Sequence, residues 1–300
     1  MSILHQKAGV PGLSTKPILL FVLLVTCAAC DTSKDFMTRA ESLAEKAAYM
    51  DSLFAMNREP AEFLKATDKR TMFGGETSPD FDKALAFLKN DLANHIPVPE
   101  DFVDPRWREV NDSICFYYCN VGEDAVFLGD SLRANVFPAE GLKWIQNETA
   151  VTSRINNSMF DRTLDPFQVL DMLEKTRYLA FINNDCIIYP YAQNVQFFSS
   201  FNPGSVRLTI KLFDLTDRSY TPFETLSVFA RNSSSISVTQ TDHQYNGKTL
   251  YKSDNASDRV LEDLAFNTIL EVRWAVYRAL VSAKKTTARQ GEYLPQDLQQ

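Results

Sequence analysis

The apolar positions of this chain form helical stripes near both ends and alternate with polar positions in between. From Phe36 to Phe54 the apolar residues recur every three or four positions, which predicts an amphipathic helix. Glu59-Pro60 predicts the start of a short second helix. Ser78-Pro79 predicts another helix that runs to about Asn94, because a capping residue followed by proline is typical of a helix start. Helices therefore dominate the N-terminal part of the predicted structure.

The middle of the chain is predicted to be rich in β-strands. Between Val206 and Phe213, apolar residues alternate with Arg207, Thr209 and Lys211. This alternation is typical of antiparallel strands with one buried face and one face in water. Other strands are predicted from their apolar and β-branched residues at Ile114–Cys119, Ala125–Leu128, Tyr178–Ile182, Cys186–Tyr191, Val195–Phe201, Glu224–Arg231 and Ser235–Thr239.

Further helices are predicted within and after this β-rich region. A short helix is predicted at Pro138–Gln146, and Asp165-Pro166 starts another that runs to about Thr176. A long helix with a continuous apolar stripe is predicted from about Ser257 to Ala283. The predicted fold class is therefore α+β: an antiparallel β-sheet with helices on one face, preceded by a helical segment and closed by a long C-terminal helix.

Composition supports a folded protein and argues against one class of partner. The chain has 300 residues, of which 45% are hydrophobic and 23% charged, so it can bury a core and is not intrinsically disordered. The net charge is −7, and no basic run is longer than Lys284-Lys285. Because a nucleic-acid interface needs clustered positive charge, we predict no nucleic-acid partner.

The N-terminus carries the clearest signal in the sequence. Lys7 and Lys16 precede the apolar run Ile18–Val25, which is followed by small residues. These are the parts of an export signal, and the run is shorter than the roughly 20 apolar residues that span a bilayer. The sequence therefore predicts a signal peptide and an exported protein.

The end of this segment resembles the lipobox of bacterial lipoproteins, in which a small residue precedes a cysteine that becomes acylated. Cys30 follows Ala28 and Ala29, whereas Cys27 follows the bulkier Thr26, so the resemblance favours Cys30 as the lipidation site. It implies a membrane partner, bound through a lipid anchor, and a location in the bacterial cell envelope. Either the inner or the outer membrane agrees with the sequence.

Four segments follow from these predictions. Residues 1–29 are the lipoprotein signal peptide, and 30–96 form a lipid tether and helical segment. Residues 97–285 form the α+β domain, and 286–300 form a polar tail.

Three further cysteines lie beyond the predicted anchor. Cys115 and Cys119 are too far apart along one strand to pair with each other. The sequence allows a disulfide from either of them to Cys186, and Cys119–Cys186 is the candidate pair. The alternative is that all three cysteines are buried, unpaired thiols. His95 and His243 offer no zinc-ligand spacing, so we predict no metal and no cofactor.

One motif suggests catalysis. Gly129-Asp130-Ser131-Leu132 follows a predicted strand and resembles the nucleophile block of GDSL-type esterases. That resemblance implies Ser131 as nucleophile, Asn184 as an oxyanion donor and His243 as base. The Asp-x-x-His block of the family is absent, and the region after Asp185 predicts strands and turns where that family needs helical crossovers.

A cluster of aromatic residues allows a second kind of site. The cluster consists of Tyr117, Tyr118, Phe197, Phe198 and Phe201. These residues either pack in the core, which is the favoured interpretation, or line a ligand cleft.

The stretch from Tyr178 to Asn232 resembles a segment of uncharacterised bacterial lipoproteins. The resemblance lies in a strand ending at Ile182-Asn183, the turn Asn202-Pro203-Gly204 and the strand that follows it. It implies an α+β fold and a lipid anchor but no activity. The leading hypothesis is a non-catalytic, lipid-anchored envelope protein that binds an unidentified envelope protein or a small ligand. The alternative is a GDSL-type esterase that uses Ser131 and His243.

Overall fold

A computed structural model describes residues 16–59, 61–70, 74–99, 102, 107, 110–111, 113–119, 166–195, 198–236, 240–245, 248–253 and 256–283. For residues 16–34, 166, 193–195, 198–200, 240–245, 248–253 and 256–257 it describes the backbone only. The elements in chain order are α1 (Lys16–Asn57), β1 (Leu64–Thr67), α2 (Phe81–Asn94), β2 (Ile114–Tyr118), α7 (Pro166–Lys175), β3 (Tyr178–Tyr189), β4 (Tyr191–Val195), β5 (Phe198–Asn202), β6 (Ser205–Asp214), β7 (Glu224–Arg231), β8 (Gln240–Tyr245), β9 (Lys248–Ser253) and α8 (Ala256–Ser282).

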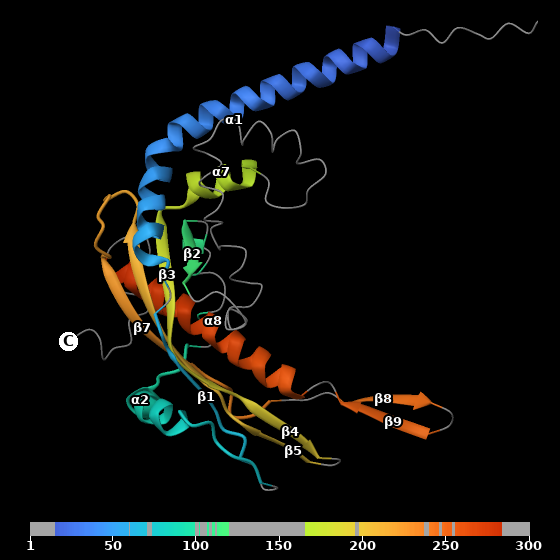
Figure 1. Ribbon diagram of the computed structural model, residues 1–300, viewed down its shortest axis with the longest axis vertical. Coiled ribbons are helices and arrows are strands. Elements are labelled where there is room, and N and C mark those ends of the chain that lie inside the picture. Colours follow the sequence, from blue (N-terminus) through green and yellow to red (C-terminus); the bar gives the residue numbers. More distant parts are fainter. Residues whose placement is uncertain are drawn as a thin grey trace, which may run out of the picture.

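The centre of the fold is a five-stranded mixed sheet built around β3 (Figure 1). On one side β3 pairs antiparallel with β6, and β6 pairs antiparallel with β7. On its other side β3 pairs in parallel with two short strands, with β2 along Tyr178–Ile182 and with β1 along Cys186–Tyr189. Two separate hairpins, β4–β5 and β8–β9, complete the described strands.

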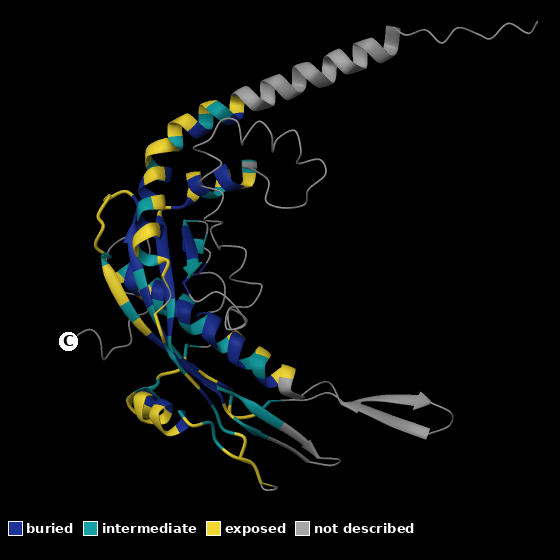
Figure 2. Cartoon of the chain, in the orientation of Figure 1, coloured by how far each residue is buried: buried dark blue, intermediate teal, exposed yellow. Residues whose placement is uncertain are grey.

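Helices cover both faces of this sheet. Along β3, Ala180 and Ile182 pack in the hydrophobic cluster that contains α8, while Leu179 and Phe181 pack in the cluster that contains α1 and α7. All four side chains are fully buried. A smaller cluster beside Cys186 is covered by α2. The burial colours show the result, with the central strands dark along their length between the helices (Figure 2).

The α+β class and the long C-terminal helix predicted from the sequence are confirmed. Within that class the structure adds two features, namely the parallel strands β1 and β2 and the helices on both faces. The second follows from β3, because a strand with apolar side chains on both faces must be covered on both faces. The expectation of helices on one face is corrected accordingly.

The segment after Glu59 also differs from the prediction. A short helix is predicted there, whereas the structure has β1, which adds to the sheet in parallel with β3. Ala66 at its centre is 2% exposed and packs in the cluster that contains α2. Burial beside β3 therefore decides the conformation of this segment, and the local pattern does not. Part of the stretch 30–96 thus belongs to the main sheet.

Contacts with α7 hold α1 in place. Arg39 Nη2 lies 2.6 Å from Asp171 Oδ1 and 2.8 Å from Glu174 Oε2 on α7. Below this surface pair, the rings of Phe36 and Phe167 meet edge to face with centroids 5.2 Å apart. Exposed ion pairs contribute less than about 1 kcal/mol each, so the buried apolar contacts account for most of the stability of this junction.

Several sequence predictions lie outside the described residues. These are the strand at Ala125–Leu128, the helix at Pro138–Gln146 and the polar tail at 286–300. Among the residues whose side chains are described, no helix is long and apolar enough to cross a membrane.

The burial of both faces of the sheet leads to a prediction about stability. Phe181 is 0% exposed and packs edge to face against Phe54 and Phe213. We expect Phe181→Ala to lower the free energy of unfolding by about 3 to 5 kcal/mol, because it leaves a cavity in the sheet face covered by α1. Phe266→Ala, at a position 57% exposed on α8, should change it by less than about 0.5 kcal/mol. Urea unfolding measures both, and equal effects would contradict the assignment of Phe181 to the core.

Candidate functional site

The end of β7 is fixed in place by the buried side chain of Asn232. Its Oδ1 accepts a hydrogen bond from the Gly204 backbone N–H at 2.7 Å. Its Nδ2 donates to the Val260 carbonyl at 2.6 Å and to Asp263 Oδ2 at 2.9 Å. Position 204 requires glycine, because an added Cβ would lie 2.7 Å from the Ile188 carbonyl oxygen. One amide thus joins the start of β6, the end of β7 and α8.

Asp263 and Asn267 on α8 extend this network along the helix. The Asp263 carboxylate accepts hydrogen bonds from the Ser233 N–H and from the Ser233 hydroxyl, each at 2.8 Å. Asn267 Nδ2 donates to the Arg231 carbonyl at 2.9 Å. Charge-assisted hydrogen bonds of this kind fix geometry more strongly than neutral ones. The result is a rigid polar wall between α8 and the end of β7.

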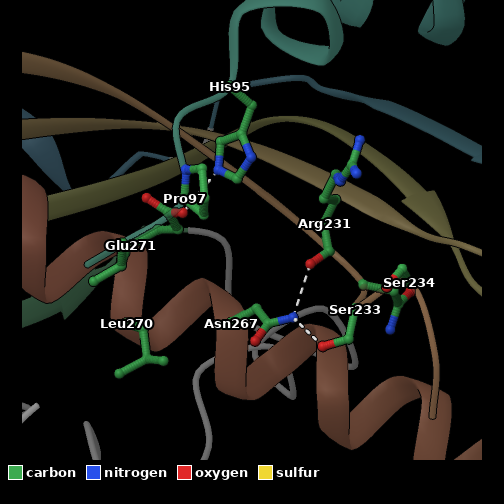
Figure 3. Close-up of a pocket in the computed structure, with 10 residues that line it drawn as sticks. His95, Pro97, Arg231, Ser233, Ser234, Asn267, Leu270 and Glu271 are labelled. Atoms are coloured by element: carbon green, nitrogen blue, oxygen red, sulfur yellow. Dashed lines mark hydrogen bonds and ion pairs between the residues drawn. The ribbon is translucent and has the colours of Figure 1, made fainter. Parts of the chain in front are cut away.

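The segment His95–Pro99, which we call the strap, follows α2 and crosses the edge of the sheet beside β7. His95 Nε2 lies 2.7 Å from Glu271 Oε1 on α8 (Figure 3), and the two side chains are only 15% and 13% exposed. The His95 ring also meets the Phe229 ring of β7 edge to face, with centroids 5.2 Å apart. The strap therefore joins the face of the sheet covered by α2 to the face covered by α8.

Two adjacent cavities lie along β7 and share His95, Pro97 and Glu271 as lining residues, and we call them together the β7 groove. Their volumes are about 350 and 460 Å³. Polar residues line much of the first, and the second also has aromatic and aliphatic walls. Besides the shared residues, the first is lined by Val98, Arg231, Asn232, Ser233, Ser234, Asn267 and Leu270. The second is also lined by Asn90, Asp91, Asn94, Ile96, Pro99, Ser227, Val228, Phe229, Trp274, Ala275 and Arg278.

The chemistry of the β7 groove suits binding. His95 is paired with Glu271, and the Ser233 hydroxyl donates to Asp263, so these two side chains are not coupled as base and nucleophile. Guanidinium, imidazole, amide and hydroxyl groups nevertheless converge on one open space. Such a combination can orient a polar ligand or a polypeptide segment by hydrogen bonds. Among the described residues, no group of three or more metal-ligating side chains could hold a metal ion.

Of the residues of the esterase hypothesis, the structure describes Asn184 and the backbone of His243, and these two lie in different sheets. Asn184 lies in β3 and is 3% exposed, beside a bulge between β3 and β6. His243 lies in β8, which belongs to the separate β8–β9 hairpin. Ser131 lies outside the described residues, and Cys30 lies in α1, where only the backbone is described.

The neighbour of Asn184 is an unusual carboxylate. Burial is the largest influence on Asp185 and raises its pKa above the ordinary value, while a 2.8 Å hydrogen bond from Thr209 Oγ1 acts in the opposite direction. Arg207 lies 3.9 Å away and is held by Asp91 at 3.0 Å. This carboxylate lies inside an ion-pair network that joins α2 to the sheet, which indicates a structural role.

The candidate disulfide Cys119–Cys186 is not formed, because Cys115, Cys119 and Cys186 are all free and buried. The Cys119 N–H donates to the Ile182 carbonyl at 3.0 Å, so Cys119 lies about three positions along β3 from Cys186. At the rise of a strand this separation is roughly 10 Å, beyond the reach of a disulfide. Cys119 and Cys186 also belong to different hydrophobic clusters.

The predicted aromatic cluster is dispersed as well. Tyr117 faces α1, with its ring edge to face against Phe54 at a centroid distance of 4.7 Å. Tyr118, the next residue of β2, packs on the opposite face with the α8 cluster. Phe198 and Phe201 lie in β5 of the β4–β5 hairpin, and Phe197 lies outside the described residues. Among the side chains that the structure describes, Tyr117 and Tyr118 therefore face opposite sides of the sheet and do not line one cleft.

The pair at the centre of the β7 groove, His95 and Glu271, was missed by sequence reasoning. The two residues are 176 positions apart, and neither belongs to a motif. The one local signal is the position of His95 directly after α2 and two residues before Pro97, where the chain leaves the helix and changes face.

The buried thiols make a prediction about reactivity. Burial raises the pKa of Cys115, Cys119 and Cys186 to about 11 each. We expect all three to resist iodoacetamide at pH 8 in the folded chain and to react once urea unfolds it, because the thiolate is the reactive form. Since these pKa values are higher in the folded chain, their contribution to stability should be complete below pH 9 and lost between about pH 9 and 11. Peptide mass spectrometry measures the labelling, and a Cys119–Cys186 linked peptide in an unreduced digest would contradict the assignment.

Comparisons with known proteins assign no family to the chain. No protein-family model, no curated protein and no solved structure matches it. The contacts of the β7 groove and the N-terminal motif are therefore the basis for a functional proposal.

Proposed function

We propose that this protein is a lipid-anchored lipoprotein of the bacterial cell envelope, acylated at Cys30. In this proposal its α+β domain binds a protein partner or a small ligand in the β7 groove and catalyses no reaction. The observation that carries the binding role is the groove itself, whose polar walls are fixed by Asn232, Asp263 and the His95–Glu271 pair.

The course of α1 supports the anchoring role. The helix runs from Lys16 to Asn57, and its first fully buried described side chain is Phe36, six residues after Cys30. Six helical residues rise about 9 Å, so a lipid at Cys30 would hold the domain close to the bilayer without a long linker. Two acyl chains at one cysteine suffice for stable anchoring, whereas one chain binds only marginally.

The arrangement of the elements supports presentation of the groove to a partner. In Figure 1, α7 lies at one end of the sheet beneath the middle of α1, and α2 lies at the opposite end. The strap follows α2, so the β7 groove lies toward the end of the domain that is opposite the proposed anchor. The net charge of −7 favours neither nucleic acid nor anionic headgroups as a second partner.

The anchor is tested at the native N-terminus. We expect mass spectrometry of the membrane-extracted protein to find an N-terminal peptide that begins with acylated Cys30. Cys30→Ser should move the protein out of the membrane fraction, because no acyl chain can be attached. Cys27→Ser is the matched control and should leave the protein in the membrane. An unmodified N-terminus at another residue would contradict the proposal.

The non-catalytic role is tested with a serine-directed probe. We expect no fluorophosphonate labelling of the full chain, since the described part of the proposed site contains no activated hydroxyl. Labelling that disappears in Ser131→Ala but persists in Ser234→Ala would show a nucleophilic serine. That result would overturn the binding role in favour of the esterase hypothesis with Ser131 and His243.

A further inference from the structure

The strand β7 forms one edge of the sheet, and its hydrogen bonds alternate in direction. It pairs with β6 from Ser205↔Arg231 to Leu212↔Glu224. The Asn232 N–H continues this ladder by donating to the Gly204 carbonyl at 3.2 Å. Because inward bonds come at every second residue of an antiparallel pair, the even-numbered residues of β7 bond to β6. The odd-numbered residues direct their N–H and C=O groups away from the sheet, and these are Thr225, Ser227, Phe229 and Arg231.

Contacts at the end of the strand agree with this assignment. The Arg231 carbonyl accepts a hydrogen bond from Asn267 Nδ2 of α8 at 2.9 Å, on the side away from β6. Within the described part of the chain, β7 pairs with β6 alone, and no other backbone hydrogen bond reaches Thr225, Ser227 or Phe229. Natural proteins normally cover or pair such an edge, because it accepts a further strand.

The strap crosses this edge without pairing to it. It meets β7 at the Phe229 ring through His95, and it carries Pro97 and Pro99, which have no N–H to donate. One cavity of the β7 groove is lined by Ser227, and the other by Arg231. Open space therefore lies beside Ser227 and beside Arg231, and His95 and Pro97 of the strap line both cavities.

We propose that β7 binds an extended polypeptide segment of a partner protein by strand addition, with the segment's main chain paired to Thr225 and Ser227. This inference rests on the proposed binding role of the β7 groove and names its partner. Donors and acceptors that repeat every second residue, about 6.6 Å apart, match an extended polypeptide backbone. Side chains of the added segment then enter the cavities beside the strap.

Charge adds a preference to this backbone pairing. Arg231 is exposed at the end of the strand, and Figure 3 shows its side chain extending beside the cavity that also contains His95. Within the described residues no ion-pair partner of Arg231 is present, so an acidic side chain in the part of the bound segment that continues past the strap gains a favourable contact. The preferred ligand is an extended segment that contains an aspartate or glutamate.

The test uses short random linear peptides displayed on phage and the full chain in detergent. We expect selection of peptides rich in acidic residues whose affinity falls at least about tenfold in Ser227→Pro. Proline removes the outward-facing N–H, which takes no part in the ladder with β6. Ser227→Ala is the matched control and should keep the affinity. Both variants lose the 3.1 Å hydrogen bond from Arg207 Nε to the Ser227 hydroxyl. The difference in peptide affinity between them therefore measures the contribution of the backbone N–H of residue 227.

A second pair of variants keeps the test decisive. If Ser227→Pro does not fold, Thr225→Pro and Thr225→Ala repeat the comparison at the next outward-facing residue. Equal affinity in the proline and alanine variants, or no selected peptide, would overturn strand addition. A dimer of the free chain that Ser227→Pro dissociates would show that β7 pairs with a second copy, which would also overturn it. Acylation of Cys30 is measured separately, so none of these results bears on the anchor.

Discussion

A strand that is apolar on both faces must be covered on both faces, and β3 imposes this requirement on the whole protein. Leu179 and Phe181 point to one side of the sheet, and Ala180 and Ile182 point to the other. Burial of each larger side chain contributes roughly 1.5 to 3 kcal/mol relative to exposure, so neither face can be left open to water. The cover comes from distant parts of the chain, with α1 and α7 on one face and α8 on the other.

This requirement makes the N-terminal helix part of the folded core. Phe36 packs against Phe167, and Phe54 packs against Phe181 of β3. One face of this helix is buried from Phe36 to Phe54, so this part of α1 is not a loose tether. If Cys30 carries the lipid, the same helix that covers the sheet also holds the domain at the membrane, and the two roles share one element.

The sequence predicts the elements whose signals are local. The capping residue and proline before α2, the apolar stripe of α8 and the alternation of β6 each lie within a single segment, and the structure contains all three elements. The two predicted strands around Asn183-Asn184-Asp185 are one continuous strand in the structure, because pairing with β6 continues through a bulge that accommodates the polar residues. No local pattern shows that a strand will be buried on both faces when the covering helices are far away in the chain.

Pairings between distant segments explain the remaining differences. β1 is four residues long and is determined by its register with Cys186–Tyr189, more than a hundred positions away. The same holds for the candidate site, since His95 and Glu271 are brought together by the path of the strap. Two of the residues named by the esterase resemblance, Asn184 and His243, belong to different sheets, which the local motifs do not indicate.

Hydrogen exchange of individual backbone amides in the free, full-length protein tests this account most directly. The amides of Phe181 and Ile182 should exchange only through global unfolding, because both are buried at the centre of the sheet. In β7, Leu226 and Val228 should be protected by β6, while Thr225 and Ser227 should exchange faster by at least about a hundredfold. Protection of Thr225 and Ser227 equal to that of their neighbours would show that the edge of β7 is already paired, and would contradict the open groove on which the proposed function depends.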